Sequence, residues 1–226
     1  MMTVEAFYAG KTYYGLVRDF HTVFNHPVGD EANPQALDTE RQIARMEWMV
    51  EEMIEFVGSD NLVNQVDAMI DLLYFILGCH VEMGCPIEVS FLDVDARGEM
   101  YPALPYAMQR PGQIEICRKI LKLVFYYGKM ATLEDQYTCL ATLSQAIMDA
   151  FARLGCNPKG LFELVHESNM DKMWPDGTVK YDPMSGKILK SPSWEPPEPY
   201  LKKEIIKRVK DYHKALEDQG DDEIPF

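Results

Sequence analysis

The chain has 226 residues, 47% of them hydrophobic, and a formal net charge of -14 at pH 7. This size allows one good hydrophobic core, or two small cores that share an interface. The acidic balance argues against nucleic acid or an anionic membrane as a partner, because both bind clustered lysine and arginine.

The cysteines and the amino terminus favour a cytoplasmic location. The 5 cysteines are odd in number and include no Cys-x-x-Cys pair, which disfavours a disulfide framework or a zinc site. No basic segment followed by an apolar run and a cleavage site opens the chain, and no uninterrupted apolar stretch has the length of a membrane span. We therefore expect a soluble, cytoplasmic protein with reduced thiols.

Apolar residues recur at intervals of three and four along most of the chain, which predicts an all-α fold. The helix boundaries come from caps and breakers. Asp38 and Asn61 are expected at helix starts, and Gly58 and Gly84 at helix ends. The predicted helices run over residues 3–24, 38–57, 61–83, 87–94, 113–129, 133–154 and 200–216.

We expect these helices to form one compact domain. Its parts are a helical half with acidic motifs at 1–94, an irregular connector at 95–112, a second helical half at 113–177, and a proline-rich loop, amphipathic helix and acidic tail at 178–226. A shift of 71 residues relates Gly84 and Phe91 to Gly155 and Phe162. The second half is either a degenerate copy of the first or a chance match, and both interpretations stay open.

Two acidic groups lie on successive predicted helices. Glu51, Glu52 and Glu55 lie within one turn on the first, and Asp67 and Asp71 within one turn on the second. The glutamates alone are more simply a solvated face opposite an apolar stripe. The aspartates lie in a helix that is apolar on all sides, where an uncompensated carboxylate is strongly unfavourable. A hard divalent cation, Mg²⁺ with Mn²⁺ as a substitute, would remove that penalty.

These motifs resemble a known family. Glu51-Glu52-x-x-Glu55, followed after a short loop by Asp67-Ala68-x-x-Asp71, is similar to the all-α nucleoside triphosphate pyrophosphohydrolases, the MazG-like group that includes the phosphoribosyl-ATP pyrophosphohydrolases. Many members have Glu-x-x-Asp in the second motif. The alanine found here departs from that and resembles shorter phage and bacterial relatives.

A later stretch resembles the same family. Asn169-x-x-Lys172 is similar to its Asn-x-x-Lys signature, whose amide and ammonium reach the substrate phosphates. Without the acidic motifs, this stretch would more simply be a solvated helix end. The resemblance thus implies that Asn169 and Lys172 bind substrate.

The resemblance implies a MazG-like helical bundle, with a pseudo-dimer of two degenerate halves as one form of it. It also implies a metal-dependent hydrolase that converts a (deoxy)nucleoside triphosphate and water into the monophosphate and pyrophosphate, as in nucleotide pool control. Glu51 or Glu52 would orient or deprotonate the attacking water. The implied Mg²⁺ ligands are Glu52, Glu55 and Asp71, with Glu51 and Asp67 assisting.

Other functions stay open. A non-catalytic nucleotide or metal sensor would also need binding carboxylates. A di-iron oxidoreductase needs Glu-x-x-His on two helices, and this chain offers it only at Glu163 and His166. Phosphoribosyl-ATP is a less favoured substrate, because the sequence shows no additional basic cluster. His21 is more simply structural, and a homodimer through residues 200–216 also stays open.

Overall fold

The computed structural model describes residues 12–89, 107–183 and 187–219. Within those ranges the regular structure is helical, apart from one isolated antiparallel bridge between Tyr181 and Ile188. The predicted all-α class is therefore confirmed. The helices are α2 (Tyr13–Val23), α3 (Thr39–Gly58), α4 (Leu62–Met83), α5 (Arg110–Tyr127), α6 (Leu133–Arg153), α7 (Leu161–Met170) and α8 (Glu198–Gln219).

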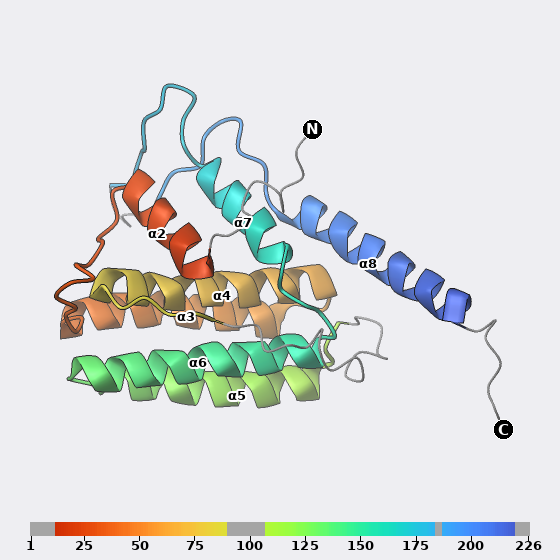
Figure 1. Ribbon diagram of the computed structural model, residues 1–226, viewed down its shortest axis with the longest axis horizontal. Coiled ribbons are helices and arrows are strands. Elements are labelled where there is room, and N and C mark those ends of the chain that lie inside the picture. Colours follow the sequence, from red (N-terminus) through yellow and green to blue (C-terminus); the bar gives the residue numbers. More distant parts are fainter. Residues whose placement is uncertain (1–11, 90–106, 184–186, 220–226) are drawn as a thin grey trace.

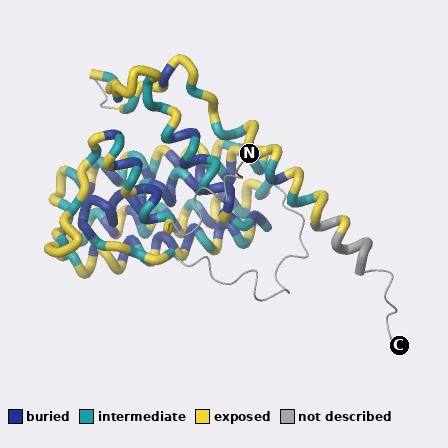
Figure 2. The backbone as a smooth tube through the Cα atoms, turned by 45° about the horizontal axis from the view of Figure 1, so that its top comes forward, coloured by how far each residue is buried: buried dark blue, intermediate teal, exposed yellow. Residues whose placement is uncertain are grey.

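Helices α3 to α6 form a bundle of two packed hairpins (Figure 1). α3 contacts α4 and α5, and α6 contacts the same two helices, which closes the arrangement. α2 and α7 lie across one side of the bundle, and both contact α4. Buried residues concentrate in this body, while most of α8 projects from it (Figure 2).

The central helix is α4, which contacts α2, α3, α6, α7 and α8. Between Val66 and Leu77 its apolar side chains are buried, apart from the half-buried Phe75, as expected for a helix that is apolar all round. Its length and hydropathy alone would also suit a membrane span, yet 67% of the apolar window is buried inside the protein. This is the pattern of a core helix.

The caps of α3 and α4 follow the prediction. Asp38 and Asn61 each accept a hydrogen bond from the backbone N–H three residues later, at 2.8 and 2.9 Å. Gly84 ends α4 with a φ of 68°, and a Cβ there would lie 2.5 Å from the carbonyl oxygen of Asp30. Because only residues 59–61 separate the two helices, α3 and α4 run antiparallel.

Several predicted boundaries differ from the structure. Residues 85–89 are not helical, so the helix predicted over 87–94 is wrong at its start, and its remainder lies outside the described residues. α5 begins inside the predicted connector, with Pro111 in its first turn. Proline is tolerated there because the backbone N–H groups of the first turn have no partner within the helix. The helix predicted over 3–24 is wrong as one continuous helix, because Thr12 is extended and caps a helix that begins at Tyr13; residues 3–11 lie outside the described part.

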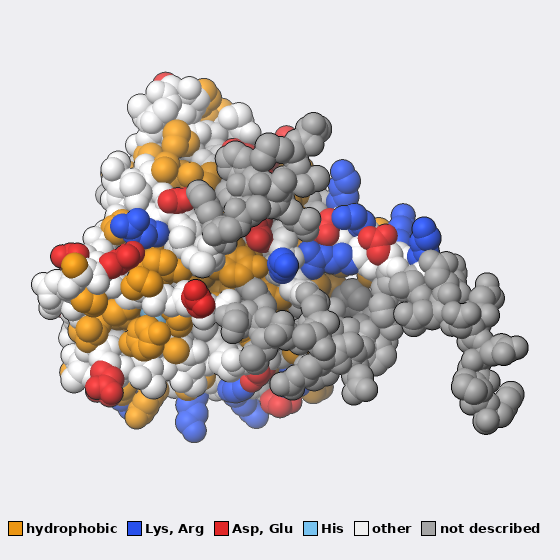
Figure 3. Space-filling view, viewed as in Figure 1, with side chains coloured by type: hydrophobic (Ala, Val, Ile, Leu, Met, Phe, Trp, Pro, Cys, Tyr) orange, Lys and Arg blue, Asp and Glu red, His pale blue; other side chains and the backbone are white. Residues whose placement is uncertain are grey.

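α8 is an amphipathic helix, as predicted, and extends beyond 200–216 at both ends. Leu201 and Ile205 are buried against the body, whereas Tyr200 and Ile206 are 47% and 45% exposed. Lysine and arginine side chains lie along its surface (Figure 3). Only the first turns of α8 are therefore part of the packed body.

The two hairpins correspond at the shift of 71 residues. That shift carries the start of α3 at Thr39 onto the start of α5 at Arg110, and the start of α4 at Leu62 onto that of α6 at Leu133. The glycines that follow the second helix of each hairpin also correspond, with φ values of 68° and 63°. Residues 85–89 and their counterparts 156–160 are both non-helical, and the counterparts of α7, residues 90–99, lie outside the described residues. Duplication of a half stays a prediction.

Candidate functional site

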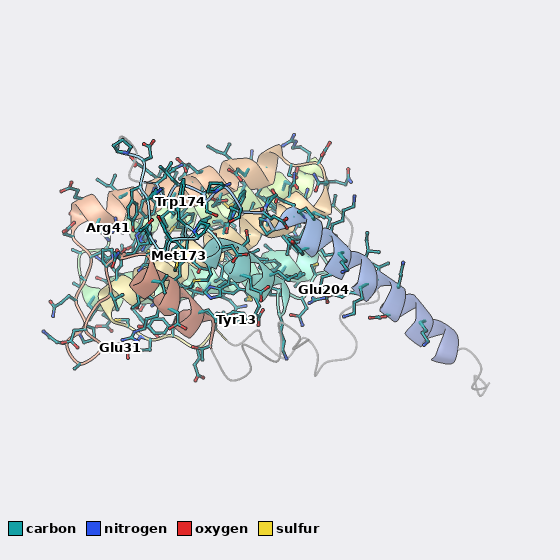
Figure 4. All side chains as sticks on the ribbon, turned by 90° about the horizontal axis from the view of Figure 1, so that it is seen from above. Tyr13, Glu31, Arg41, Met173, Trp174 and Glu204 are labelled. Atoms are coloured by element: carbon teal, nitrogen blue, oxygen red, sulfur yellow. The ribbon has the colours of Figure 1, made fainter. Side chains whose placement is uncertain are left out.

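A cavity of about 620 Å³ lies where α2, α3 and α4 meet the segment that follows α7. Seen from above, Met173 and Trp174 of that segment lie over the same end of the bundle as Arg41 of α3 (Figure 4). Asp67 is not among the residues that line the cavity. The other six predicted site residues do line it, namely Glu51, Glu52, Glu55, Asp71, Asn169 and Lys172.

The glutamates of α3 do not share one solvated face. Glu51 and Glu55 are exposed, but Glu52 is only 9% exposed. Glu52 lies one turn from Met49 and beside Met53, both fully buried, so it belongs to the face that packs on α4. The interpretation of these glutamates as a surface face is therefore wrong for Glu52.

The acidic side chains between α3 and α4 are crowded and poorly solvated. Burial, together with the charge of Asp71, raises the pKa of Glu52 and of Asp67 far above the usual carboxylate range. Burial also raises the pKa of Asp71, although the nearby ammonium of Lys172 acts in the opposite direction. Like charges thus repel each other at this place, and a bound cation would relieve the repulsion.

The acidic residues match a divalent cation in chemistry. Glu52 Oε2 and Asp67 Oδ1 are buried and have no hydrogen-bond partner among the residues that the structure describes. The atoms that these acidic residues could offer to a metal are all carboxylate oxygens, which suit a hard cation. In the described part of the chain, however, no three His, Cys, Asp or Glu side chains converge closely enough to hold a metal ion. The residues fit Mg²⁺ by donor type without forming an assembled ligand set.

The end of α7 supplies the opposite wall of the cavity. Lys172 donates a hydrogen bond to Asn169 Oδ1 at 2.6 Å, and Asn169 is only 9% exposed. Burial lowers the pKa of Lys172, while the charges of Asp71 and other carboxylates oppose that shift. The predicted amide and ammonium therefore face the acidic wall.

The Glu-x-x-His sequence of α7 is occupied with other contacts. Glu163 Oε2 accepts a hydrogen bond from the backbone N–H of Gly160 at 2.7 Å and so caps the helix. His166 Nδ1 lies 2.9 Å from the hydroxyl of Tyr74. These contacts disfavour a di-iron site. His21 has a structural environment as well, since its Nδ1 lies 2.7 Å from the carbonyl oxygen of Pro27.

The cavity is also lined by aromatic and guanidinium groups that the sequence did not single out. Arg41 Nε and Arg45 Nη2 donate hydrogen bonds to Glu82 at 2.7 and 2.6 Å. Each guanidinium carbon also lies 5.2 Å from the ring centroid of Trp48, and the ring of Trp48 lies 5.6 Å from that of Phe75. The i, i+4 spacing of the two arginines, with Arg45 six residues before Glu51 on the same helix, was the available signal.

The expected absence of a further basic cluster is wrong. Besides Lys172, the cavity is lined by Arg41 and Arg45 and by two lysines of the C-terminal segment, Lys187 and Lys190. Lys187 Nζ lies 2.9 Å from Glu51 Oε2, so one of the predicted glutamates is already paired with a cation.

Comparison with known proteins finds a family model that matches the part of the chain with the acidic helices. Residues 17–98 match the model of the phosphoribosyl-ATP pyrophosphohydrolase family, a range that contains both acidic motifs and excludes the Asn-x-x-Lys stretch. The chain is 26% identical over 178 residues to uncharacterized protein L479 of Acanthamoeba polyphaga mimivirus, covering 68% of this chain. The match spans only 64% of that relative's length.

A solved structure also aligns with the chain. It is that of a proposed NTP pyrophosphohydrolase from Exiguobacterium sp. 255-15, with 26% sequence identity and a TM-score of 0.48. The alignment covers 89% of this chain and 98% of that one.

Proposed function

We propose that this chain is a metal-dependent nucleoside triphosphate pyrophosphohydrolase, and the match of residues 17–98 to the phosphoribosyl-ATP pyrophosphohydrolase family model supports the proposal. It would convert a (deoxy)nucleoside triphosphate and water into the monophosphate and pyrophosphate. The observation that carries the proposal is the cavity, in which a carboxylate wall faces a wall of ammonium groups. A triphosphate with its divalent cations is complementary to both walls.

The shape of the lining supports a nucleotide substrate. Besides the carboxylates and lysines, Trp48, Phe75 and His26 line the cavity and supply flat aromatic surfaces to it. Aromatic rings of this kind stack on bases of any type, because every base has a π-face. We propose that the nucleoside lies against these rings and the phosphates against the lysines.

The chain's own residues have distinct proposed roles. Glu52, Glu55 and Asp71 would hold Mg²⁺, with Glu51 and Asp67 assisting and Mn²⁺ as a substitute. When bound, Mg²⁺ supplies neutralisation of the phosphate charge and an acidified water.

The remaining roles concern the phosphates and the attacking water. Asn169 and Lys172 would orient the phosphates. Glu52 is better suited than Glu51 to orient or deprotonate the attacking water, because Glu51 is paired with Lys187. Attack of water at the α-phosphorus would break the bond between the α- and β-phosphates and release pyrophosphate.

A panel of ribo- and deoxyribonucleoside triphosphates, incubated with the chain and Mg²⁺, tests the proposal. Each reaction is scored separately for pyrophosphate and for orthophosphate. Pyrophosphate with the monophosphate is the expected product pair. Orthophosphate with a diphosphate would reject the proposed bond cleavage, and tight nucleotide binding without any product would identify a sensor instead.

A further inference from the structure

The cationic lining of the cavity is unusual for this chain. The sequence has 36 acidic and 22 basic residues, yet five basic side chains line the cavity against four carboxylates. Arg41 and Arg45 are both paired with Glu82, which lies outside the lining. The three lysines come from the segment after α7, and only Lys172 belongs to the Asn-x-x-Lys stretch.

Lys190 is held in place by a built support. Its ammonium lies 3.6 Å from the centroid of the Trp194 ring. The indole N–H of Trp194 donates to the carbonyl oxygen of Ser168 at 2.9 Å, and the hydroxyl of the buried Ser191 donates to that of Asp171 at 3.2 Å. The segment on either side of Lys190 is thus tied to the end of α7, which carries Asn169 and Lys172.

Lys190 also differs from Lys187 in its electrostatic partners. Lys187 is paired with Glu51. Among the residues that the structure describes, no carboxylate lies in ion-pair range of the Lys190 ammonium. Lys190 and Lys172 line the same cavity and repel each other, and the charge of Asp71 acts on both ammonium groups. When a cation binds Asp71, a polyphosphate would supply the negative charge that the two lysines need.

We propose that Lys190, positioned by Trp194, binds the polyphosphate chain of the substrate together with Lys172. The inference rests on the proposed function for the identity of the substrate, but not for the anion site itself. A flexible lysine supplies a point charge, and stacking on an aromatic ring reduces the freedom that it must lose on binding. Trp194 is then a positioning residue that acts through Lys190.

The chain contains a matched control for this lysine. Lys180 lies 3.4 Å from the ring centroid of Trp174, in the same C-terminal segment, so it makes the same kind of contact. It is not among the residues that line the cavity. Lys180→Ala therefore removes an equal charge and an equal ring contact at a place where the proposal expects no anion.

The test is calorimetric titration of the full chain with inorganic tripolyphosphate in the presence of Mg²⁺, a probe that needs no turnover. Lys190→Ala should weaken binding about 10-fold or more, as for the loss of a charge-assisted contact. Lys180→Ala should stay within about twofold of the parent, and Lys190→Arg should restore most of the affinity because it keeps the charge.

Two further variants address the support of Lys190. Trp194→Leu should weaken binding in the same direction as Lys190→Ala, and Trp194→Phe should recover it, because phenylalanine keeps a ring face. Circular dichroism of each variant establishes that it is folded. If the leucine variant does not fold, the Lys190 variants decide the question alone.

The outcomes separate this inference from the proposed function. Unchanged tripolyphosphate affinity in Lys190→Ala, or an equal loss in Lys180→Ala, would overturn the inference even if the chain hydrolyses nucleotides. Absence of tripolyphosphate binding by the parent chain would overturn it as well. Binding that depends on Lys190, without any nucleotide hydrolysis, would sustain the anion site and reject the proposed reaction.

Discussion

Replacing Glu52 by glutamine should stabilise the metal-free protein at neutral and alkaline pH. Burial, and then the charge of Asp71, raises the pKa of Glu52 from 4.5 to about 9. The folded state therefore binds the proton more tightly than the unfolded chain. Stability is intact below about pH 4.5 and is lost as the pH rises toward 9. Each pH unit in this window costs about 1.4 kcal/mol, hence about 3 kcal/mol at pH 7.

Urea unfolding followed by circular dichroism, in the presence of a chelator, measures this effect. Between about pH 5 and about pH 8 the free energy of unfolding of the parent chain should fall, and Glu52→Gln should remove much of that fall. Burial also raises the pKa of Asp67, so Asp67 contributes to the same decrease in the free energy of unfolding. The Glu52→Gln variant keeps Asp67 and therefore keeps this part of the decrease. Saturating Mn²⁺ should stabilise the parent chain more than the variant.

The control for this experiment is Glu47→Gln. Glu47 is exposed on the same helix and does not line the cavity, so its replacement should change the free energy of unfolding by less than about 0.5 kcal/mol at each pH. An equal pH dependence in the parent chain and in Glu52→Gln would refute the assignment of Glu52 as a buried, repelled carboxylate.

Other substitutions test the site and the fold. Glu55→Gln and Asp71→Asn should each remove most turnover while circular dichroism shows unchanged helix content; near-normal turnover of Asp71→Asn at saturating Mg²⁺ would show that the site is wrongly assigned. Lys172→Ala should weaken substrate binding or transition-state stabilisation by about 1.5 to 3 kcal/mol without abolishing Mn²⁺ binding, and unchanged kinetics would exclude it from the site. Gly84→Ala should lower stability by about 1 kcal/mol or more, because alanine there combines a positive φ with a clash against Asp30; an unchanged urea midpoint would contradict this.

The ends of α3 and α4 were predictable because they are encoded locally. Asp38 and Asn61 cap the helices with their own side chains, and Gly84 supplies a conformation that other residues avoid. Apolar spacing over eight residues was too little information to establish a helix at 87–94. Pro111 was misread as part of an irregular connector, because proline can either break a helix or begin one.

The site was predictable only in part, because its environment is made by tertiary packing. The two acidic motifs could be found from their spacing on neighbouring helices. The burial of Glu52 depends on how α3 packs against α4, which the charge pattern of α3 alone does not reveal. Lys187 and Lys190 have the local sequence of solvated lysines in a proline-rich loop, and only the path of the chain after α7 brings them to the cavity.

The ion pair between Lys187 and Glu51 joins residues 136 positions apart. Synthesis on the ribosome proceeds from the amino terminus, and early units can pack before later ones emerge. A nascent or truncated chain that ends before the segment after α7 would carry both acidic helices but none of the three cavity lysines. The cavity is therefore complete only once the chain has been made as far as Lys190, and a product that ends before Lys172 would lack the wall proposed to bind phosphate.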